Sequence, residues 1–278
     1  MQTLRVGHSP DADDAFMFYP LAKKIVTIAG YEITHVLEEI QALNQRALTG
    51  ELEVTAISAA VHPQVAQHYR IMPCGASVGR NYGPVLVSKF PLKLDDLSGK
   101  RIAIPGQYTT ANMLLKIFVT TSFESVFLPF DEVTKAVQQG EVDAGILIHE
   151  GQIRPRELDL HPLMDLGQVW FDDTGLPIPL GLDMVHRRLG DDLSQKVARA
   201  LQEAIIHSRS HENDALDYAL QFGRGIDLET GRRFVRMYVN EDTVDFGKDG
   251  RKALETLYHR AADRGLIPDV PQMDVVEL

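Results

Sequence analysis

The sequence predicts an α/β protein built from two lobes, with the second lobe inserted into the first. Strand-like and helix-like segments alternate from residue 4 to residue 68 in the order βαβαβα, which is typical of a mostly parallel sheet covered by helices. A second series, βαβαβ, starts at residue 101 after a Lys- and Asp-rich link at residues 89–100. A Gly- and Pro-rich loop at residues 174–181 then leads into a return strand that ends at Val185, and helices dominate the remainder.

The first series is predicted from short, distinct patterns. Residues 4–6 are predicted to form a strand, and Ser9 then caps a helix with Pro10 at its first position and carboxylates in its positively charged first turn. We expect this helix to end near Lys24. The remaining elements follow from the same periodicities: a strand at 31–37, a helix at 40–48, a strand at 54–57 and a helix at 59–68.

The second series sets the lobe boundaries. Its predicted elements are strands at 85–88, 101–104, 125–128 and 142–148 and helices at 110–121 and 131–139. We place the first part of lobe 1 at residues 1–86, the inserted lobe 2 at 87–185, and the return of lobe 1 with the C-terminal helices at 186–278. This arrangement is a hinged clamshell of the periplasmic-binding-protein type (type II). A single doubly wound domain is the alternative that composition and element order leave open.

The composition limits the classes of partner. The chain has 278 residues, 44% of them hydrophobic and 24% charged, which is enough for an ample core. Its formal net charge is −11, and its isoelectric point is near 5.3. Because this charge repels phosphate, we expect no nucleic-acid partner and no membrane partner. A small anionic ligand would need donor groups gathered at one place.

The sequence favours a cytoplasmic location. The single cysteine, Cys74, excludes a disulfide within the chain and is typical of a reducing compartment. Residues 1–7 run directly into the first predicted strand, without the basic region, apolar stretch or cleavage site of a signal peptide. No apolar run approaches the roughly 18 residues that a membrane-spanning helix requires.

Two strand ends carry polar groups suited to binding an anion. Residues 102–110 form a strand that breaks into Thr109 and Thr110 before a helix, and residues 54–58 form a strand that ends at Ser58. Backbone N–H groups and side-chain hydroxyls converge at such helix starts. They predict an anion site, and helix capping without a ligand is the alternative interpretation.

His149 is the candidate for chemistry. It follows the apolar strand predicted at residues 142–148 and precedes Glu150 and Gly151. It should therefore emerge at the carboxyl end of that strand and face the same crevice as the predicted anion site. A neutral imidazole, with an ordinary pKa of about 6.5, can accept a proton near neutral pH without a cofactor. A purely structural histidine is the alternative.

Several chemical signatures are missing from the sequence. It contains no G-x-x-x-x-G-K-[ST] and no G-x-G-x-x-G that opens a helix after a strand, so we expect no nucleotide site of those kinds. No G-x-S-x-G occurs, and Cys74 lacks a local catalytic-cysteine signature. His207 and His211 share a helix face without an H-E-x-x-H motif, and the carboxylates at residues 11–14 suit a first helical turn. We therefore predict no metal ion.

Five stretches of sequence, taken together, resemble one family. They lie at residues 9–19, 79–84, 105–111, 140–150 and 174–181, in the same order, and span most of the chain. In these stretches the chain is similar to the MqnA/MqnD group of menaquinone-biosynthesis enzymes of the futalosine route, and within it to the 1,4-dihydroxy-6-naphthoate synthases. The resemblance implies the two-lobed periplasmic-binding-protein fold, in agreement with the lobes predicted above.

The resemblance also implies a reaction and a set of site residues. The family converts cyclic dehypoxanthinyl futalosine into 1,4-dihydroxy-6-naphthoate without a cofactor, and His149 matches its proposed proton acceptor. Its substrate contacts match Thr109 and Thr110 in the hydroxyl turn and Ile57 and Ser58 at the strand end. The resemblance thus implies a carbon–carbon lyase that holds the substrate carboxylate at the helix starts, while His149 removes a proton next to the substrate ketone.

The first helix start departs from the family. Some members carry Cys-Pro-Asn where this chain has Asp11, Ala12 and Asp13, so no family role is carried over to these residues. Ser9, at the end of the first strand, is a further candidate for substrate binding. Asn81, in the Gly-rich turn at residues 79–84, is another.

Two other functions remain open at the level of sequence. The sister branch of the group dehydrates chorismate, which is also a small carboxylate, but the segment at residues 148–150 and the loop at 174–181 favour the synthase branch. A non-catalytic protein that binds a small carboxylate is common on this fold, because fold does not determine function. A transport receptor, however, normally carries an export signal or a lipid-anchoring cysteine. The sequence does not indicate an oligomeric state.

Overall fold

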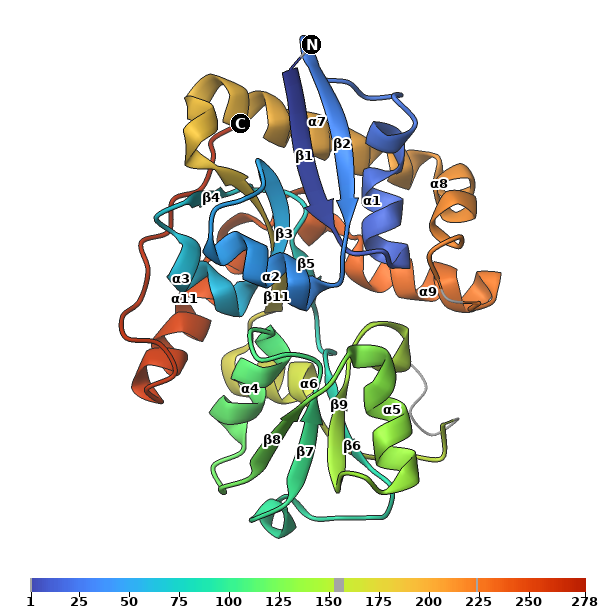
Figure 1. Cartoon of the computed structure of the whole chain (residues 1–278), viewed down its shortest axis with the longest axis vertical. Helices are drawn as coiled ribbons and strands as arrows, with labels where there is room; N and C mark the ends of the chain where they lie inside the picture. The colour runs from blue at the N-terminus through green and yellow to red at the C-terminus, as the bar shows by residue number, and fades with distance from the viewer. Residues whose placement is uncertain (1, 153–157, 224) are drawn as a thin grey trace.

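Two β-sheets divide the protein into an upper and a lower lobe, as drawn in Figure 1. The structure is a computed structural model that describes residues 2–152, 158–223 and 225–278. In these ranges the upper sheet has six strands: β1 (Gln2–His8), β2 (Tyr31–Leu37), β3 (Val54–Ser58), β4 (Tyr69–Ile71), β5 (Ser77–Gly79) and β11 (Ile178–His186). Their order is β2-β1-β3-β11-β4, with β5 paired to β11. β1 is parallel to β2 and β3, whereas β11 is antiparallel to β3.

The lower sheet belongs to the inserted lobe. Its five strands in the described ranges are β6 (Val85–Ser88), β7 (Arg101–Ile104), β8 (Glu124–Phe127), β9 (Ala144–Leu147) and β10 (His161–Asp165), in the order β10-β6-β9-β7-β8. β7 is parallel to β8 and β9, and β6 is antiparallel to β9 and β10. Every residue of β6 and β9 is buried, which explains their continuous apolar sequences.

Helices cover both sheets. Those of lobe 1 are α1 (Ala12–Ala22), α2 (Ile40–Leu48), α3 (His62–Val65), α7 (Gly190–Ser210), α8 (Glu212–Ala219), α9 (Leu228–Tyr238), α10 (Glu241–Val244) and α11 (Gly247–Asp263). Those of lobe 2 are α4 (Thr110–Phe118), α5 (Phe130–Gln139) and α6 (Leu166–Thr174), and short 3-10 helices include η1 (Ala59–Val61) and η3 (His149–Gln152). None of the helices described combines the length and apolar character needed to cross a membrane.

The chain crosses between the two lobes at other positions than the predicted boundaries at residues 86 and 185. β6 lies wholly in the lower sheet, so the first crossing falls at residues 80–84. β11 lies wholly in the upper sheet, so the second crossing falls at residues 175–177. Both strands are mostly apolar, a pattern that suits a buried strand in either sheet, so their sequences did not assign them to a lobe.

Three predicted helices begin or end differently in the structure. The helix predicted at residues 110–121 is α4, which ends at Phe118. Asp11, and not Ser9, is the N-cap of α1, because the Asp14 N–H donates to Asp11 Oδ1 (3.2 Å). The predicted helix at residues 59–68 is instead η1 followed by the single turn of α3, which ends at Val65. The chain must turn there to enter β4, where Tyr69 is buried against β11.

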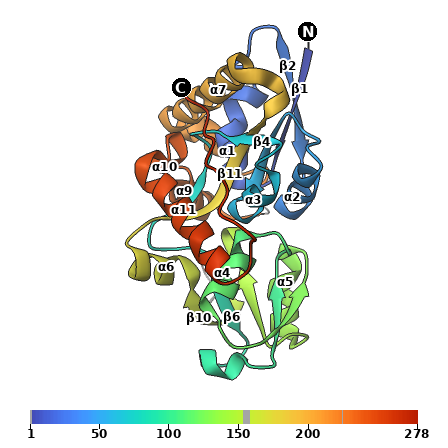
Figure 2. The ribbon, with the colours of Figure 1, turned by 90° about the vertical axis from the view of Figure 1, so that its left-hand side faces the viewer.

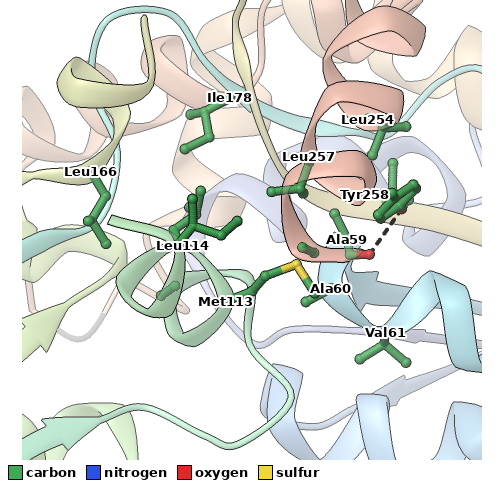
Figure 3. Close-up of a cluster of buried hydrophobic side chains, with 14 of the residues drawn as sticks. Ala59, Ala60, Val61, Met113, Leu114, Leu166, Ile178, Leu254, Leu257 and Tyr258 are labelled. Atoms are coloured by element: carbon green, nitrogen blue, oxygen red, sulfur yellow. Dashed lines mark hydrogen bonds between the residues drawn. The ribbon is translucent and has the colours of Figure 1, made fainter. Parts of the chain in front are cut away.

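A hydrophobic cluster joins the lobes on one side. Figure 3 shows Met113 and Leu114 of α4 beside Leu257 of α11 and Ala60 of η1, and all four side chains are buried. The Tyr258 hydroxyl of α11 donates to a carbonyl of η1 (3.0 Å). Figures 1 and 2 show α11 extending from lobe 1 toward α4 of lobe 2. This packing fixes the start of α4 relative to lobe 1.

Candidate active site

A cavity between the lobes gathers the predicted site residues. Ser9, Ile57, Ser58, Thr109, Thr110 and His149 all line it. They come from the ends of β1, β3 and β9 and from the start of α4, which matches the expectation that ligands bind at the carboxyl ends of strands. The structure therefore brings together residues that are up to 140 positions apart in the sequence, from Ser9 to His149.

Asn81 lies elsewhere. It is exposed, and it is outside the lining of this cavity as far as the described residues define it. Its φ of +68° is in the left-handed region, which asparagine tolerates better than most residues. The asparagine thus has a conformational role in the turn that carries the chain from β5 to β6.

The start of α1 supplies a carboxylate that was not selected from the sequence. Asp11 is 3% exposed, and its Oδ1 accepts from the Asp14 N–H, which caps the helix. Its other oxygen, Oδ2, lies 3.2 Å from Nδ1 of His149. One buried side chain therefore both begins a helix of lobe 1 and contacts the histidine of lobe 2.

His149 is held in an unusual conformation. Its φ of +52° is left-handed, which costs on the order of 1–3 kcal/mol and must be offset by the surroundings. Asp11 contacts one edge of the imidazole, and the Phe130 ring meets it at a tilt of 67° with centroids 4.8 Å apart. Because an ionised carboxylate can only accept, a hydrogen on Nδ1 would face Asp11 and leave Nε2 as the nitrogen that can accept a proton.

Two further carboxyl groups lie behind the start of α1. Burial raises the pKa of Asp14 well above its ordinary value, and the charges of Asp11 and Asp183 add to this, although the Ser9 N–H opposes it by donating to Asp14 Oδ2 (2.6 Å). Burial alone raises the pKa of Asp183 to about 8. Both shifts favour the neutral form of the carboxyl group, which lowers the negative charge at and near this side of the cavity.

Ser58 keeps a donor for a ligand. Its N–H donates to Asn44 Oδ1 (2.8 Å), and its Oγ accepts from Asn44 Nδ2 (3.0 Å), so the hydroxyl proton remains to be donated. Asn44 is fully buried in α2 and fixes the end of β3 through this pair of bonds. The sequence offered no signal for Asn44, because its partner lies 14 residues away across a turn.

The two threonine hydroxyls are already used within the protein. Thr109 is the N-cap of α4: its Oγ1 accepts from the Asn112 N–H (3.2 Å) and donates to the Gly106 carbonyl (2.9 Å). Thr110 Oγ1 donates to a carbonyl of β11 (2.6 Å) and accepts from the Ala60 N–H (3.2 Å), both in lobe 1. The N–H groups of Thr110 and Ala111 precede the first intrahelical bond, and they are the donors that the start of α4 can offer to an anion.

Gln152 and Tyr238 also line the cavity and were not selected from the sequence. Gln152 belongs to η3, three residues after His149, and Tyr238 ends α9. The Gln152 Nε2 donates to the Tyr238 hydroxyl (2.6 Å) across the gap between the lobes. The two residues are 86 positions apart, so no local pattern predicts their contact.

Asp11, Asp13 and His149 also form a donor set that could hold a metal ion. Each offers one ligand atom, and these atoms lie within 4.8 Å of one another. Carboxylates and imidazole suit divalent metals such as zinc. The contact between Asp11 Oδ2 and His149 Nδ1 accounts for two of these groups without an ion. The absence of a metal stays a prediction.

Comparisons with known proteins identify the family. The family model for menaquinone biosynthesis matches residues 4–263. The chain belongs to this menaquinone-biosynthesis family. It is 35% identical over 272 residues to a protein of Thermus thermophilus named 1,4-dihydroxy-6-naphthoate synthase, covering 98% of each chain. It is 33% identical over 273 residues to a protein of the same name from Streptomyces coelicolor, covering 96% of this chain and 95% of the relative.

Solved structures agree with the family's fold. A crystal structure of a protein from Archaeoglobus fulgidus has a TM-score of 0.91 at 45% identity, covering 95% of this chain and 98% of the other. The alkanesulfonate-binding protein of Xanthomonas axonopodis pv. citri has a TM-score of 0.71 at 16% identity, covering 99% and 96%, and at this identity the likeness concerns the fold alone. The predicted two-lobed, periplasmic-binding-protein-like fold is confirmed.

Proposed function

We propose that this protein is a 1,4-dihydroxy-6-naphthoate synthase, a carbon–carbon lyase that converts cyclic dehypoxanthinyl futalosine into 1,4-dihydroxy-6-naphthoate for menaquinone biosynthesis. The observation that carries the proposal is the His149–Asp11 pair inside a cavity between the lobes. Family membership and the names of both relatives support it. The reaction needs an acceptor for one proton and a rigid hold on the substrate, which the cavity can supply without a cofactor.

In this proposal His149 acts as the general base. Asp11 fixes the proton on Nδ1 and orients the ring, so Nε2 removes the proton next to the substrate ketone. The carbon–carbon bond to the sugar-derived fragment then breaks, and formation of the aromatic ring drives the reaction forward. Asp11 is a positioning residue in this scheme, because it acts through His149.

The substrate carboxylate binds at the start of α4. The N–H groups of Thr110 and Ala111 and the hydroxyl of Ser58 supply the donors, and Ile57 contributes apolar contact beside them. Ser9 also lines the cavity, two residues before Asp11, the N-cap of α1. In this proposal backbone N–H groups, and not the hydroxyls of Thr109 and Thr110, bind the carboxylate, because both hydroxyls already donate to carbonyl groups of the protein.

The proposal includes a cytoplasmic place of action. It is supported by Cys74, which is buried as a free thiol and therefore requires no oxidising compartment.

One assay tests the function. Purified protein is incubated with cyclic dehypoxanthinyl futalosine and, separately, with chorismate, in the absence of metal and nucleotide. We expect 1,4-dihydroxy-6-naphthoate from the first incubation and no reaction in the second. Dehydration of chorismate, or binding of the first compound without turnover, would contradict the proposal.

A further inference from the structure

Two polar atoms in the cavity lack the partners that buried groups normally have. Gln152 is 8% exposed and Ser9 is 3% exposed. Neither Gln152 Oε1 nor Ser9 Oγ has a hydrogen-bond partner among the residues in the described ranges. Buried polar atoms are usually paired, because leaving them unpaired is unfavourable. Since both residues line the cavity, a bound ligand is the natural source of the missing partners.

Tyr238 completes this group with a donor. Its hydroxyl accepts from Gln152 Nε2 (2.6 Å), so its own proton remains to be donated. Burial raises the pKa of Tyr238 well above its ordinary value, which keeps the phenol protonated across the physiological range. The group thus presents an acceptor at Gln152, a donor at Tyr238, and a hydroxyl at Ser9 that can do either.

The charge around this group selects the ligand chemistry. The carboxylates of Asp11 and Asp13 line the same cavity, and Gln152 Oε1 is itself an acceptor. A carboxylate placed here would meet oxygen atoms of like polarity and would be repelled. A hydroxyl group fits, because it can donate to Gln152 and accept from Tyr238 at the same time.

We propose that Gln152, Tyr238 and Ser9 form a subsite for neutral hydroxyl groups of the substrate, and that it holds the sugar-derived fragment. This inference rests on the proposed function. It separates two recognition tasks in one cavity: backbone donors at the start of α4 bind the carboxylate, and this subsite binds the fragment that leaves. Because Gln152 belongs to lobe 2 and Tyr238 to lobe 1, a fragment bound here also contacts both lobes.

The test compares the substrate with the product, which lacks the fragment. In Gln152→Leu and in Tyr238→Phe we expect KM for cyclic dehypoxanthinyl futalosine to rise about tenfold, while Kd for 1,4-dihydroxy-6-naphthoate changes less than about twofold. Ser9→Ala removes an atom without a partner in the described chain, so it leaves folding intact and should raise KM by about threefold.

Tyr82→Phe is the matched control. The Tyr82 ring packs against Tyr238 with centroids 5.6 Å apart, but its hydroxyl donates to the carbonyl of Met237, away from the cavity lining. We expect KM and Kd close to those of the wild type in this variant. Thermal melting of each variant shows whether it is folded.

The outcomes separate the inference from the proposed function. An unchanged KM in the variants of Gln152, Tyr238 and Ser9 would overturn the inference. An equal loss of affinity for substrate and product would also overturn it, because it would indicate a structural contact between the lobes. A wild-type protein that does not convert the substrate would contradict the proposed function, and the inference would fall with it.

Discussion

The starts of α1 and α4 both line the cavity, yet they use their polar side chains differently. At α4 the Thr109 and Thr110 hydroxyls are consumed by bonds within the protein, which leaves backbone N–H groups for a ligand. At α1 the Asp11 carboxylate caps the helix with one oxygen and contacts His149 with the other. A cap residue with two acceptor atoms can therefore serve folding and the site together, whereas each threonine hydroxyl has already donated its only proton to a protein carbonyl.

The comparison assigns chemistry to one helix start and binding to the other. If it holds, changes at Asp11, the N-cap of α1, and at its partner His149 should lower kcat, whereas changes at the start of α4 should raise KM. Each variant below is chosen to break that division or to sharpen it.

The largest effect is expected for the base. His149→Asn should lower kcat by about 10² to 10⁴, because the substrate loses its proton acceptor while the carboxylate donors remain. Steady-state rates and the Kd for the substrate, measured by calorimetry, check this. Retained kcat at saturating substrate would refute the role of His149.

The next effect concerns Asp11. Asn also caps helices well, so Asp11→Asn should keep the fold but lose the charge that orients the imidazole, and kcat should fall on the order of 10-fold to 100-fold with little change in KM. Rates across a range of substrate concentrations separate the two parameters.

Asp227→Asn is the control for this substitution. Asp227 is the N-cap of α9, where its Oδ1 accepts from the Thr230 N–H (2.8 Å), and it is outside the cavity lining formed by the described residues. The same chemical change there should leave kcat as in the wild type. If Asp11→Asn also left kcat unchanged, Asp11 would be a helix cap alone.

The fold and several of the cavity residues could be predicted from the sequence, because they depend on local patterns. The alternation of strands and helices follows from hydrophobic periodicity, and the two-lobed fold it predicted is confirmed. The positions of Ser58, Thr109 and His149 follow from the ends of strands, and all three line the cavity. The strands β4 and β5 were missed, because three residues are too few to establish a period.

The remainder depends on contacts between distant parts of the chain. Asp11 could be assigned to a helix start from its neighbours, but its contact with His149 joins residues 138 positions apart, from 11 to 149. The partner of Gln152 likewise lies on another lobe. Asn81 was selected because it is polar and lies in a turn, although its backbone conformation accounts for it. Residue type and spacing do not distinguish a turn residue from a ligand contact.

A smaller effect is expected on the α4 side. Thr110→Val removes a hydroxyl that joins α4 to η1 and β11, leaving the Ala60 N–H and a partly buried carbonyl without this partner. We expect a loss of about 1–3 kcal/mol in the free energy of unfolding and a several-fold rise in KM, with kcat largely kept. Chemical denaturation and steady-state kinetics measure these quantities. Unchanged affinity would count against the binding role of this helix start.

The smallest effect on catalysis, and the last difference between the two helix starts, concerns pH. The first turn of α4 contains no carboxylate, whereas Asp14 in α1 lies near Asp183, whose pKa burial raises to about 8 from an ordinary 3.8. A raised pKa in the folded state means that the folded protein binds a proton which the unfolded chain has already released. The stabilisation from this proton is therefore complete below about pH 4 and is lost as pH rises toward 8. Asp183→Asn should flatten the decline in melting temperature between pH 5 and pH 8, with little change in kcat. A decline as steep as that of the wild type would show that another group controls it.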